Sequence, residues 1–466
     1  MIEISRRDWI IATAALPWIG MSKPLSGASI QDRQLATGGS ASHYKVEMAA
    51  SGNLELDPNS KQVKTVPFRV EGDFEFVQRH RQIEDCLWIG RAFERATAQM
   101  QVGRGATVSR LNDLSEIIVH RVEPLTSTTI RQDFFRQSLP LESSEIDLIF
   151  IPGISPTLSG WLEPGFQGQV GESWEPPAWN VAAALAIDAI IDGQIECRLD
   201  KRSEESVNVS VQGQVQGLAS GVATEITLSG ICLSNRSTEE LESLIWNVRE
   251  KRALGPATPG FEARTKIEVT RTVPASWSAD QEAQLAVVME SQNDSDPTLV
   301  FESKRHGFRL QHGKGWRVVS DQAKAAILRY VSSGELIAQA QFTRLADLPA
   351  GVSFSAKRYR SDVAKAIEGT SGQIVDVAES TTSKGYQSLR VIVSSEVSGI
   401  PIQWIYYHLA DKQGRRVGWV ITMEQDRVDR FGAEDQILVD QFEIIDANPP
   451  KSEAQTAQKN GSVEKK

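Results

Sequence analysis

The sequence predicts an α+β protein that is mainly antiparallel β, with a large β-rich domain followed by a smaller α-β-α sandwich. Three observations predict this class. Apolar and polar residues alternate over many stretches that end in Gly, Pro, Asn or Asp, which is typical of strands joined by short turns. Helical periodicity is confined to a few segments, and a turn-forming run at residues 294–297 divides the chain. Because 466 residues suffice for two or three domains, we expect one domain over residues 44–293 and another over residues 298–446.

Residues 1–28 have the order of an export signal peptide. Arg6 and Arg7 precede an apolar run at residues 9–19, and the small residues 26–28 provide a cleavage site. The apolar run is shorter than the ~20 residues that a membrane-spanning helix needs. The arginine pair, which follows Ser5, resembles the twin-arginine class of bacterial signals, whose cargo crosses the membrane folded. A general secretory signal and an uncleaved amphipathic anchor are the alternatives.

This signal predicts the location and one partner of the protein. We expect the twin-arginine export machinery as a partner, a periplasmic or otherwise exported location, and no stable transmembrane span after cleavage. Residues 29–43 are expected to form a polar linker, and residues 447–466 a disordered tail. The formal net charge of −10 argues against a nucleic-acid partner, because such a partner requires a concentrated basic face.

Three cysteines do not make a disulfide framework in an exported chain of this length. Cys197 and Cys232 share strand parity with apolar neighbours, so both are predicted to point into a core as reduced thiols. A bridge between these two cysteines is the alternative. Cys86 also has apolar neighbours, and none of the three has the histidine partner that a thiol nucleophile requires.

The first domain is predicted to be a series of strands with one helix. Residues 57–60 form a turn, because Pro fixes its φ angle while Asp and Asn hydrogen-bond back to the backbone. Residues 86–102 fit either a helix or a strand, and we favour the strand. The helix covers the Ala-rich residues 179–191 and ends at Gly193, which can take the left-handed C-terminal position. The predicted strands are residues 44–56, 63–70, 74–77, 86–102, 114–120, 146–151, 194–200, 207–215, 224–234 and 261–274.

A distinctive order of motifs fills the middle of this domain. Residues 171–174 read Gly-Glu-Ser-Trp, the Ala-rich helix follows, and paired strands end in Arg-Glu-Lys-Arg at residues 249–252 and Pro-Gly-Phe at residues 259–261. This order resembles exported planctomycete-type proteins of no assigned activity. The resemblance implies an antiparallel β-rich shell and carries no active site to this chain.

The second domain is predicted to open with a hairpin over residues 307–318 and to contain a helix at residues 361–368. Three long strands follow at residues 387–396, 400–409 and 416–424, and then an amphipathic helix with Phe431, Ile437, Leu438 and Phe442. This order, with Ile437, Leu438 and Phe442 in the closing helix, resembles the PsbP-like α-β-α sandwich. The members of that fold differ in function, so the resemblance implies a fold and no activity.

Aromatic residues in both domains are the candidate ligand-binding residues. They lie in a stretch of the first domain over residues 160–180, which we call the Trp-rich stretch, and on two strands of the second domain. There they would line a cleft for a small apolar ligand or an envelope protein. They are Trp161, Phe166, Trp174, Trp179, Trp404, Tyr406 and Trp419.

Titratable residues give weaker signals. Glu163, Glu172 and Glu175 lie among the tryptophans, as carboxylates and stacking rings do in glycosidases, but a structural role is favoured. Asp188 and Asp192 would share a helix face at i, i+4, which is usually a solvated face.

Three histidines offer no convincing metal site. His306 and His312 lie among Lys and Arg, which disfavour a bound cation, and His408 on a strand is more often hydrogen-bonded than a ligand.

The common catalytic motifs are absent from the sequence. We therefore predict a non-enzymatic binding or scaffold protein of the bacterial cell envelope, with no cofactor and no metal. The alternative is an envelope polysaccharide hydrolase that uses Glu172 or Glu175, and a third possibility is that the second domain docks onto a membrane complex.

Overall fold

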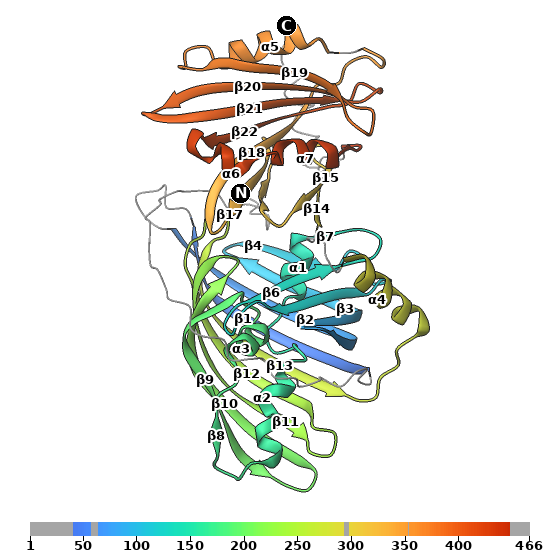
Figure 1. Ribbon diagram of the computed structural model, residues 1–466, viewed down its shortest axis with the longest axis vertical. Coiled ribbons are helices and arrows are strands. Elements are labelled where there is room, and N and C mark those ends of the chain that lie inside the picture. Colours follow the sequence, from blue (N-terminus) through green and yellow to red (C-terminus); the bar gives the residue numbers. More distant parts are fainter. Residues whose placement is uncertain (1–40, 57–63, 293–297, 353, 448–466) are drawn as a thin grey trace. The chain divides into compact units, whose positions relative to one another are not determined.

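The computed structural model describes residues 41–56, 64–292, 298–352 and 354–447, and these form two compact units (Figure 1). The larger unit comprises residues 41–255 and 259–292, and the smaller unit comprises residues 256–258 and 298–447. The strands of both units pair antiparallel, so the class is mainly antiparallel β as predicted. The export signal, most of the linker, the turn at residues 57–60 and the tail beyond Ala447 lie outside the described residues.

The larger unit is built on one twelve-stranded antiparallel sheet. Its order is β6-β5-β3-β2-β1-β13-β12-β11-β10-β9-β8, and β4 pairs with β3. The strands are β1 (Ser42–Leu56), β2 (Lys64–Ile83), β3 (Cys86–Val102), β4 (Gly105–Arg110), β5 (Ile118–Pro124), β6 (Ile130–Phe135), β8 (Ser173–Trp174), β9 (Ala189–Arg202), β10 (Ser206–Ala219), β11 (Val222–Asn235), β12 (Glu240–Arg252) and β13 (Gly260–Thr272); the short β7 (Leu141–Glu142) lies between β6 and the first helix.

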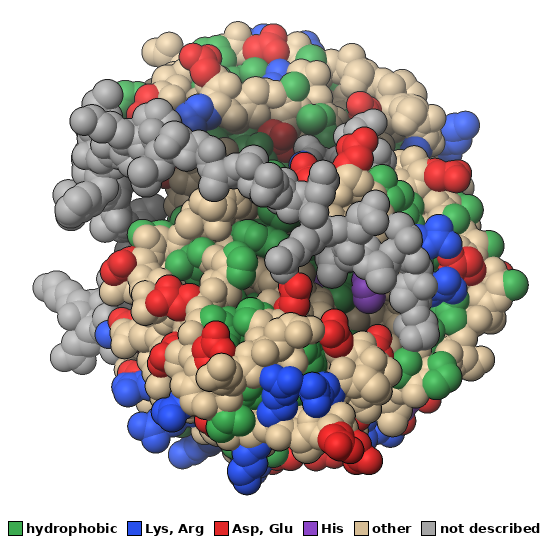
Figure 2. Space-filling model, turned by 60° about the horizontal axis from the view of Figure 1, so that its bottom comes forward, with side chains coloured by type: hydrophobic (Ala, Val, Ile, Leu, Met, Phe, Trp, Pro, Cys, Tyr) green, Lys and Arg blue, Asp and Glu red, His purple; other side chains and the backbone are tan. Residues whose placement is uncertain are grey.

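Side-chain alternation divides this sheet into an apolar inner face and a polar outer face. In β10, Val207, Val209 and Val211 are buried, and the polar residues between them are more exposed. Successive side chains of a strand point to opposite faces, so the alternation in the sequence directly sets which residues enter the core. On the face shown in Figure 2, acidic and basic side chains are interspersed, so that face offers no continuous basic surface.

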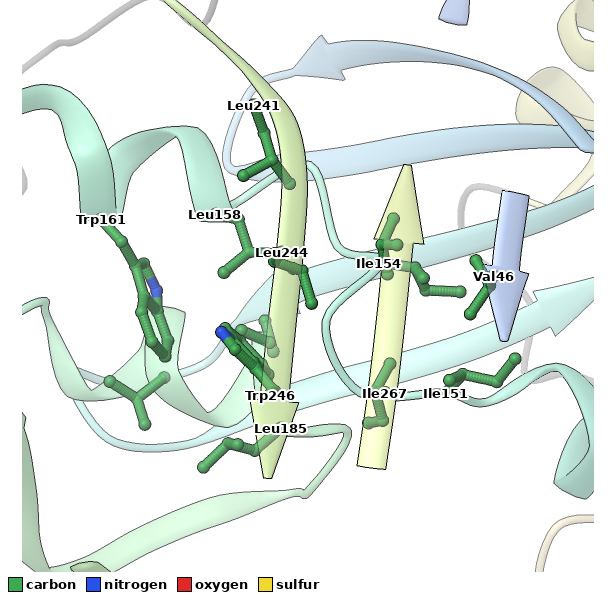
Figure 3. Close-up of a cluster of buried hydrophobic side chains, with 14 of the residues drawn as sticks. Val46, Ile151, Ile154, Leu158, Trp161, Leu185, Leu241, Leu244, Trp246 and Ile267 are labelled. Carbon is green, nitrogen blue, oxygen red and sulfur yellow. The ribbon is translucent and has the colours of Figure 1, made fainter. Parts of the chain in front are cut away.

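Three short helices cover the inner face, and a fourth packs on the outer face. They are α1 (Ser143–Ile149), α2 (Leu158–Gln167), α3 (Ala178–Leu185) and, outside, α4 (Ala279–Gln292). Figure 3 shows Leu158 and Trp161 of α2 beside Leu244 and Trp246 of β12 in the main core. The outer helix α4 buries Leu285, Val288 and Met289 against Trp88 and Phe135, which makes a second, smaller core.

Several strand predictions were confirmed in position, but two features of the first half differ. The segments predicted as separate strands at residues 63–70 and 74–77 form one long strand, β2, over the described residues 64–83. The glycine between them is needed for close packing, because a Cβ atom at Gly72 would lie 2.6 Å from the Phe74 ring. Residues 146–151 were wrongly predicted as a strand: α1 begins after Glu142, whose side chain and that of Glu145 form a reciprocal capping box.

The predicted helix at residues 179–191 is shorter than expected, and several strands were missed. The helix ends at Leu185, with Ala186 in the left-handed conformation at φ 58°. Gly193 lies instead inside β9, where a Cβ atom would approach the Gln214 carbonyl oxygen to 2.3 Å. Strands β4 and β6 were not predicted, and of β12 only the end at residues 249–252 was noted. β12 carries the large core residue Trp246.

The smaller unit contains a seven-stranded antiparallel sheet of order β16-β17-β18-β22-β21-β20-β19. A short helical segment, α6, and α7 pack on one face of this sheet, and α5 packs on the other. The elements are β14 (Thr298–Ser303), β15 (Phe308–Gly313), β16 (Trp316–Asp321), β17 (Ala326–Ser332), β18 (Glu335–Leu345), α5 (Ala356–Ala366), β19 (Gln373–Thr381), β20 (Gln387–Val397), β21 (Ile400–Ala410), β22 (Arg416–Glu424), α6 (Val428–Phe431), α7 (Glu434–Gln441) and β23 (Phe442–Ile444), with a 3₁₀ turn at Gln425–Arg427.

The three long strands of this unit were predicted correctly, whereas its first hairpin was not. β15 pairs with β14 and β23, and β16 pairs with β17, so the two halves of the expected hairpin belong to different sheets. In the closing segment Leu438 is buried, but Ile437 is 49% exposed and Phe442 begins β23. The PsbP-like assignment stays a prediction. No helix within the described ranges is long and apolar enough to cross a membrane.

Candidate functional site

Trp161 and Phe166, predicted to line a cleft, are core residues of α2. The Trp161 ring is 0% exposed and stacks on Trp246 of β12, with ring centroids 5.6 Å apart (Figure 3). Its indole Nε1 donates a hydrogen bond to Asn180 Oδ1 at 2.9 Å. The expectation that these two residues face a ligand is therefore corrected, because α2 fills the inner face of the sheet with them.

Trp174 and Trp179 are half-buried at the edge of the same core. Trp174 Nε1 donates to the carbonyl oxygen of Trp161 at 2.7 Å, which ties β8 to α2. Both side chains keep part of their surface in solvent, and their ligand role stays a prediction.

The three aromatic candidates of the smaller unit divide between the two faces of its sheet. Trp404 and Tyr406 are two residues apart on β21, so their side chains share one face. In the register, Tyr406 lies opposite Val420 and Tyr407 lies opposite Trp419. Trp419 therefore points to the other face, where it is 3% exposed and stacked on Tyr407 with centroids 4.8 Å apart. The expectation that Trp419 lines the same cleft is corrected.

The face that carries Trp404 and Tyr406 is only partly covered by α5. The helix packs Val363 and Ile367 against Val391 and Val393 of β20, and both aromatic rings contact this cluster. On the neighbouring strand β22, Thr422 lies opposite Trp404 and Val420 lies opposite Tyr406, and both are half-buried. We call these four residues together the aromatic face.

The chemistry of the aromatic face is that of an uncharged surface. Burial raises the pKa of the Tyr406 hydroxyl and also that of Tyr359 on α5, so both phenols stay protonated and can donate a hydrogen bond at neutral pH. Gln341 of β18 lies opposite Val420 and is exposed, which adds an amide at the rim. Half-exposed rings beside hydroxyl and amide groups can bind a flat apolar molecule or the face of a sugar ring.

The acidic residues of the Trp-rich stretch are all exposed. The carboxylate of Glu172 accepts a hydrogen bond from the backbone N–H of Gln169 at 2.9 Å, which closes the turn after α2. Glu172 also borders an open surface hollow of about 690 Å³ that includes Pro164 and Gln167. Glu163 and Glu175 border no part of that hollow.

The predicted Asp188 and Asp192 pair does not exist as a helix face. The helix ends at Leu185, so Asp188 lies in the connection to β9 and Asp192 lies within β9. The Asp188 carboxylate accepts a hydrogen bond from the backbone N–H of Gly221 at 3.2 Å, which is a structural role.

The three histidines considered in the smaller unit are buried and lie in separate environments. His306 Nε2 lies 2.8 Å from the carbonyl oxygen of Gln322, and His312 Nδ1 lies 3.0 Å from that of Gly313. The ring of His408 packs against Phe354, with centroids 4.7 Å apart. Burial lowers the pKa of His312 and of His408 to about 4, which keeps both rings neutral.

Cys197 and Cys232 are buried free thiols, as their strand parity predicted. Burial raises the pKa of Cys232 to about 12 and also raises that of Cys197, so neither thiol is reactive at neutral pH.

Several buried charged residues were missed by the sequence analysis, and Arg91 is one of them. Arg91 of β3 is 2% exposed and shares strand parity with the core residues Ile89 and Phe93, which is the signal that could have identified it. Its Nε donates to Gln78 Oε1 at 2.8 Å, and its guanidinium lies 5.6 Å from the centre of the Phe76 ring. No carboxylate in the described part of the chain pairs with it, and burial lowers its pKa to about 10.

The fold and these placements define a β-rich protein with two units and one partly open aromatic face. No protein-family model matches the chain, and no curated protein matches it. Among solved structures, the translocator domain of the autotransporter NalP from Neisseria meningitidis is similar over 82% of this chain and 88% of its own, at 9% identity and a TM-score of 0.14. OccK11 (OpdR) from Pseudomonas aeruginosa is similar over 83% and 94%, at 5% identity and a TM-score of 0.12. Scores this low carry no argument about fold or function.

Proposed function

We propose that this protein is an exported, non-enzymatic binding or scaffold protein of the bacterial cell envelope, and that its ligand binds to the aromatic face of the smaller unit. The ligand is an uncharged, largely apolar molecule or a segment of an envelope protein. The observation that carries the proposal is the pair of half-buried rings, Trp404 and Tyr406, side by side on a sheet face that α5 covers only in part.

Export is supported by the sequence alone. Arg6 and Arg7, followed by an apolar run and a small-residue cleavage site, are the features that the twin-arginine machinery requires. A folded cargo suits this route, and the buried free thiols Cys197 and Cys232 need no oxidation after export.

Binding is favoured over polysaccharide hydrolysis by the environment of the Trp-rich stretch. A glycosidase needs two carboxylates about 5–9.5 Å apart beside rings that stack on the sugar. The Trp161 ring is enclosed in the core, and the Glu172 carboxylate caps a backbone turn. The hydrolase is tested by incubating the purified protein with a panel of bacterial glycans, where turnover that Glu172→Gln abolishes would support it.

The binding proposal is tested by titrating the purified chain with two uncharged probes, N-phenyl-1-naphthylamine and a series of soluble neutral oligosaccharides, followed by fluorescence. We expect saturable binding of at least one probe. Trp404→Ala and Tyr406→Ala each remove buried contact surface from the probe, so each should weaken its binding by about tenfold, since that factor corresponds to ~1.4 kcal/mol.

Trp179→Ala is the matched control, because Trp179 is also half-buried but belongs to the larger unit. Its binding curve should match that of the unmodified chain, and circular dichroism should show that all three variants are folded. Saturable binding that is lost in Trp179→Ala and kept in Trp404→Ala would assign the ligand to the other unit. An absence of binding of either probe would contradict the proposal.

A further inference from the structure

Three potential metal ligands converge on the outer face of the larger unit, from three adjacent strands. His43 lies on β1, Glu75 on β2 and Glu94 on β3, and one ligand atom from each lies within 4.8 Å of the others. Their positions in the register explain this, because β1 pairs with β2 and β2 pairs with β3. His43 lies opposite Val77, and Glu75 is two residues before Val77 on the same strand, so His43 and Glu75 are diagonal neighbours.

A β-bulge in β3 brings Glu94 to this face. Glu75 lies opposite Arg95 and Phe76 lies opposite Phe93, so Glu94 is the extra residue with no partner on β2. Phe93 and Ala96 both point into the core, and the two residues between them are exposed or half-exposed. An unbulged strand would turn one of these two side chains inward, so the extra residue is what adds a second carboxylate to the outer face.

The distance between His43 and Glu75 fits a small divalent cation. In a tetrahedral zinc site with bonds of about 2.0–2.1 Å, neighbouring ligand atoms lie about 3.3 Å apart. His43 Nε2 and Glu75 Oε1 are 3.3 Å apart. Glu94 is exposed at the surface, so a change of its side-chain rotamer can complete the approach to the other two atoms.

The neighbouring charged residues orient the Glu75 carboxylate and leave its Oε1 atom available to a metal ion. Arg95 binds the other oxygen of the Glu75 carboxylate at 2.9 Å and Asp73 at 2.8 Å, so Glu75 is held while Oε1 faces His43. This is how an outer partner commonly fixes a ligating carboxylate. Lys45, directly opposite Glu75, is drawn away by an ion pair with Glu47 at 2.8 Å.

We propose that His43, Glu75 and Glu94 form a zinc-binding site. One imidazole nitrogen and two carboxylate oxygens neutralise the double charge of Zn²⁺, and this mixed nitrogen and oxygen set suits zinc better than magnesium or calcium. Three protein ligands leave one coordination position to solvent. The site is independent of the aromatic face, which belongs to the other unit.

The test is isothermal titration of the untagged chain with Zn²⁺ alone, with Co²⁺ absorption spectra as a second measurement. We expect one equivalent of Zn²⁺ to bind with a Kd tighter than ~100 μM. His43→Ala, Glu75→Gln and Glu94→Gln should each weaken binding by about tenfold or more. Co²⁺ should give visible bands that the His43→Ala variant loses, because they require the imidazole nitrogen.

Glu71→Gln is the matched control. Glu71 lies on the same strand and the same face as Glu75, where it pairs with Arg69 outside the site. Its affinity for Zn²⁺ should equal that of the unmodified chain. The Glu→Gln changes preserve shape, and circular dichroism verifies that each variant is folded. The proposal is overturned if no Zn²⁺ binds, if the three ligand variants bind normally, or if Glu71→Gln weakens binding as much as they do.

Discussion

Trp161→Ala tests directly whether the Trp-rich stretch fills the inner face of the larger unit. The side chain is 0% exposed, stacks on Trp246 and donates its indole N–H to Asn180. Truncation removes the ring, leaves Trp246 without its stacking partner and leaves a buried amide oxygen without its donor. A tryptophan that lined a cleft would lose little stability on the same change.

The size of the effect follows from burial. A tryptophan buries about 150–250 Å² of surface, which at about 25 cal/mol per Å² corresponds to roughly 4–6 kcal/mol. Core Trp→Ala changes cost about 3–5 kcal/mol, and an orphaned buried oxygen adds about 1–3 kcal/mol. We therefore expect a loss of about 5 kcal/mol. Trp161→Phe keeps a ring and should cost only about 1–2 kcal/mol, since it loses mainly the hydrogen bond.

The assay is unfolding in urea, monitored by the hydrogen exchange of peptides from β12. Because β12 belongs to the larger unit, this exchange reports on the unfolding of that unit alone. With a denaturant slope of about 2.5 kcal/mol per M, a loss of 5 kcal/mol lowers the midpoint by about 2 M. Trp179→Ala, at the half-buried edge of the core, is the comparison and should shift the midpoint far less. A shift below about 0.4 M for Trp161→Ala, which corresponds to about 1 kcal/mol, would refute the packing described for α2.

Two further predictions concern buried titratable groups. Burial lowers the pKa of His312 from 6.5 to about 4, so between these pH values the unfolded chain binds a proton that the folded chain does not. The free energy of unfolding of the smaller unit should therefore fall by about 3 kcal/mol as the pH falls from 6.5 to 4. Urea unfolding at several pH values measures this dependence, and His312→Gln should make it weaker. Cys197 and Cys232 lie on β9 and β11, which flank β10, and they pair with Val211 and Val209 of β10. Two strand spacings and this offset place their Cα atoms about 12 Å apart, so they cannot be bridged without backbone movement. Alkylation after unfolding without reductant should label every thiol, and a cross-linked Cys197–Cys232 peptide would contradict the register.

Local alternation predicted most strands of the larger unit, because every second side chain of a strand faces the core. The three strands β20, β21 and β22 were located closely for this reason. Elsewhere in the smaller unit alternation missed β14, β17, β18 and β19. Pairing is a different matter, since it depends on contacts between distant residues. Alternation therefore located the segments that became β15 and β16 but gave no indication that they join different sheets.

The aromatic candidates show the same limit at the level of the site. Aromatic content in Gly- and Pro-rich sequence predicted exposure, yet Trp161 is enclosed because helix formation at α2 turns it toward Trp246. Trp404 and Tyr406 share a face as their spacing predicts, whereas Trp419 is on a neighbouring strand. Its face depends on the register between β21 and β22, in which a shift by one residue would reverse it.

The ambiguity of residues 86–102 and the proposed zinc site have one physical cause. Phe93 and Ala96 are three residues apart and both face the core, which is the spacing of a helix and made the segment fit two predictions. The strand accommodates that spacing because Glu94 is a bulge residue that shifts the alternation by one position. An interruption of the alternation between apolar and polar residues within a strand therefore indicates a bulge, at which an additional side chain points to the outer face. In this strand the additional side chain is that of Glu94, whose carboxylate joins His43 and Glu75 as the third potential metal ligand.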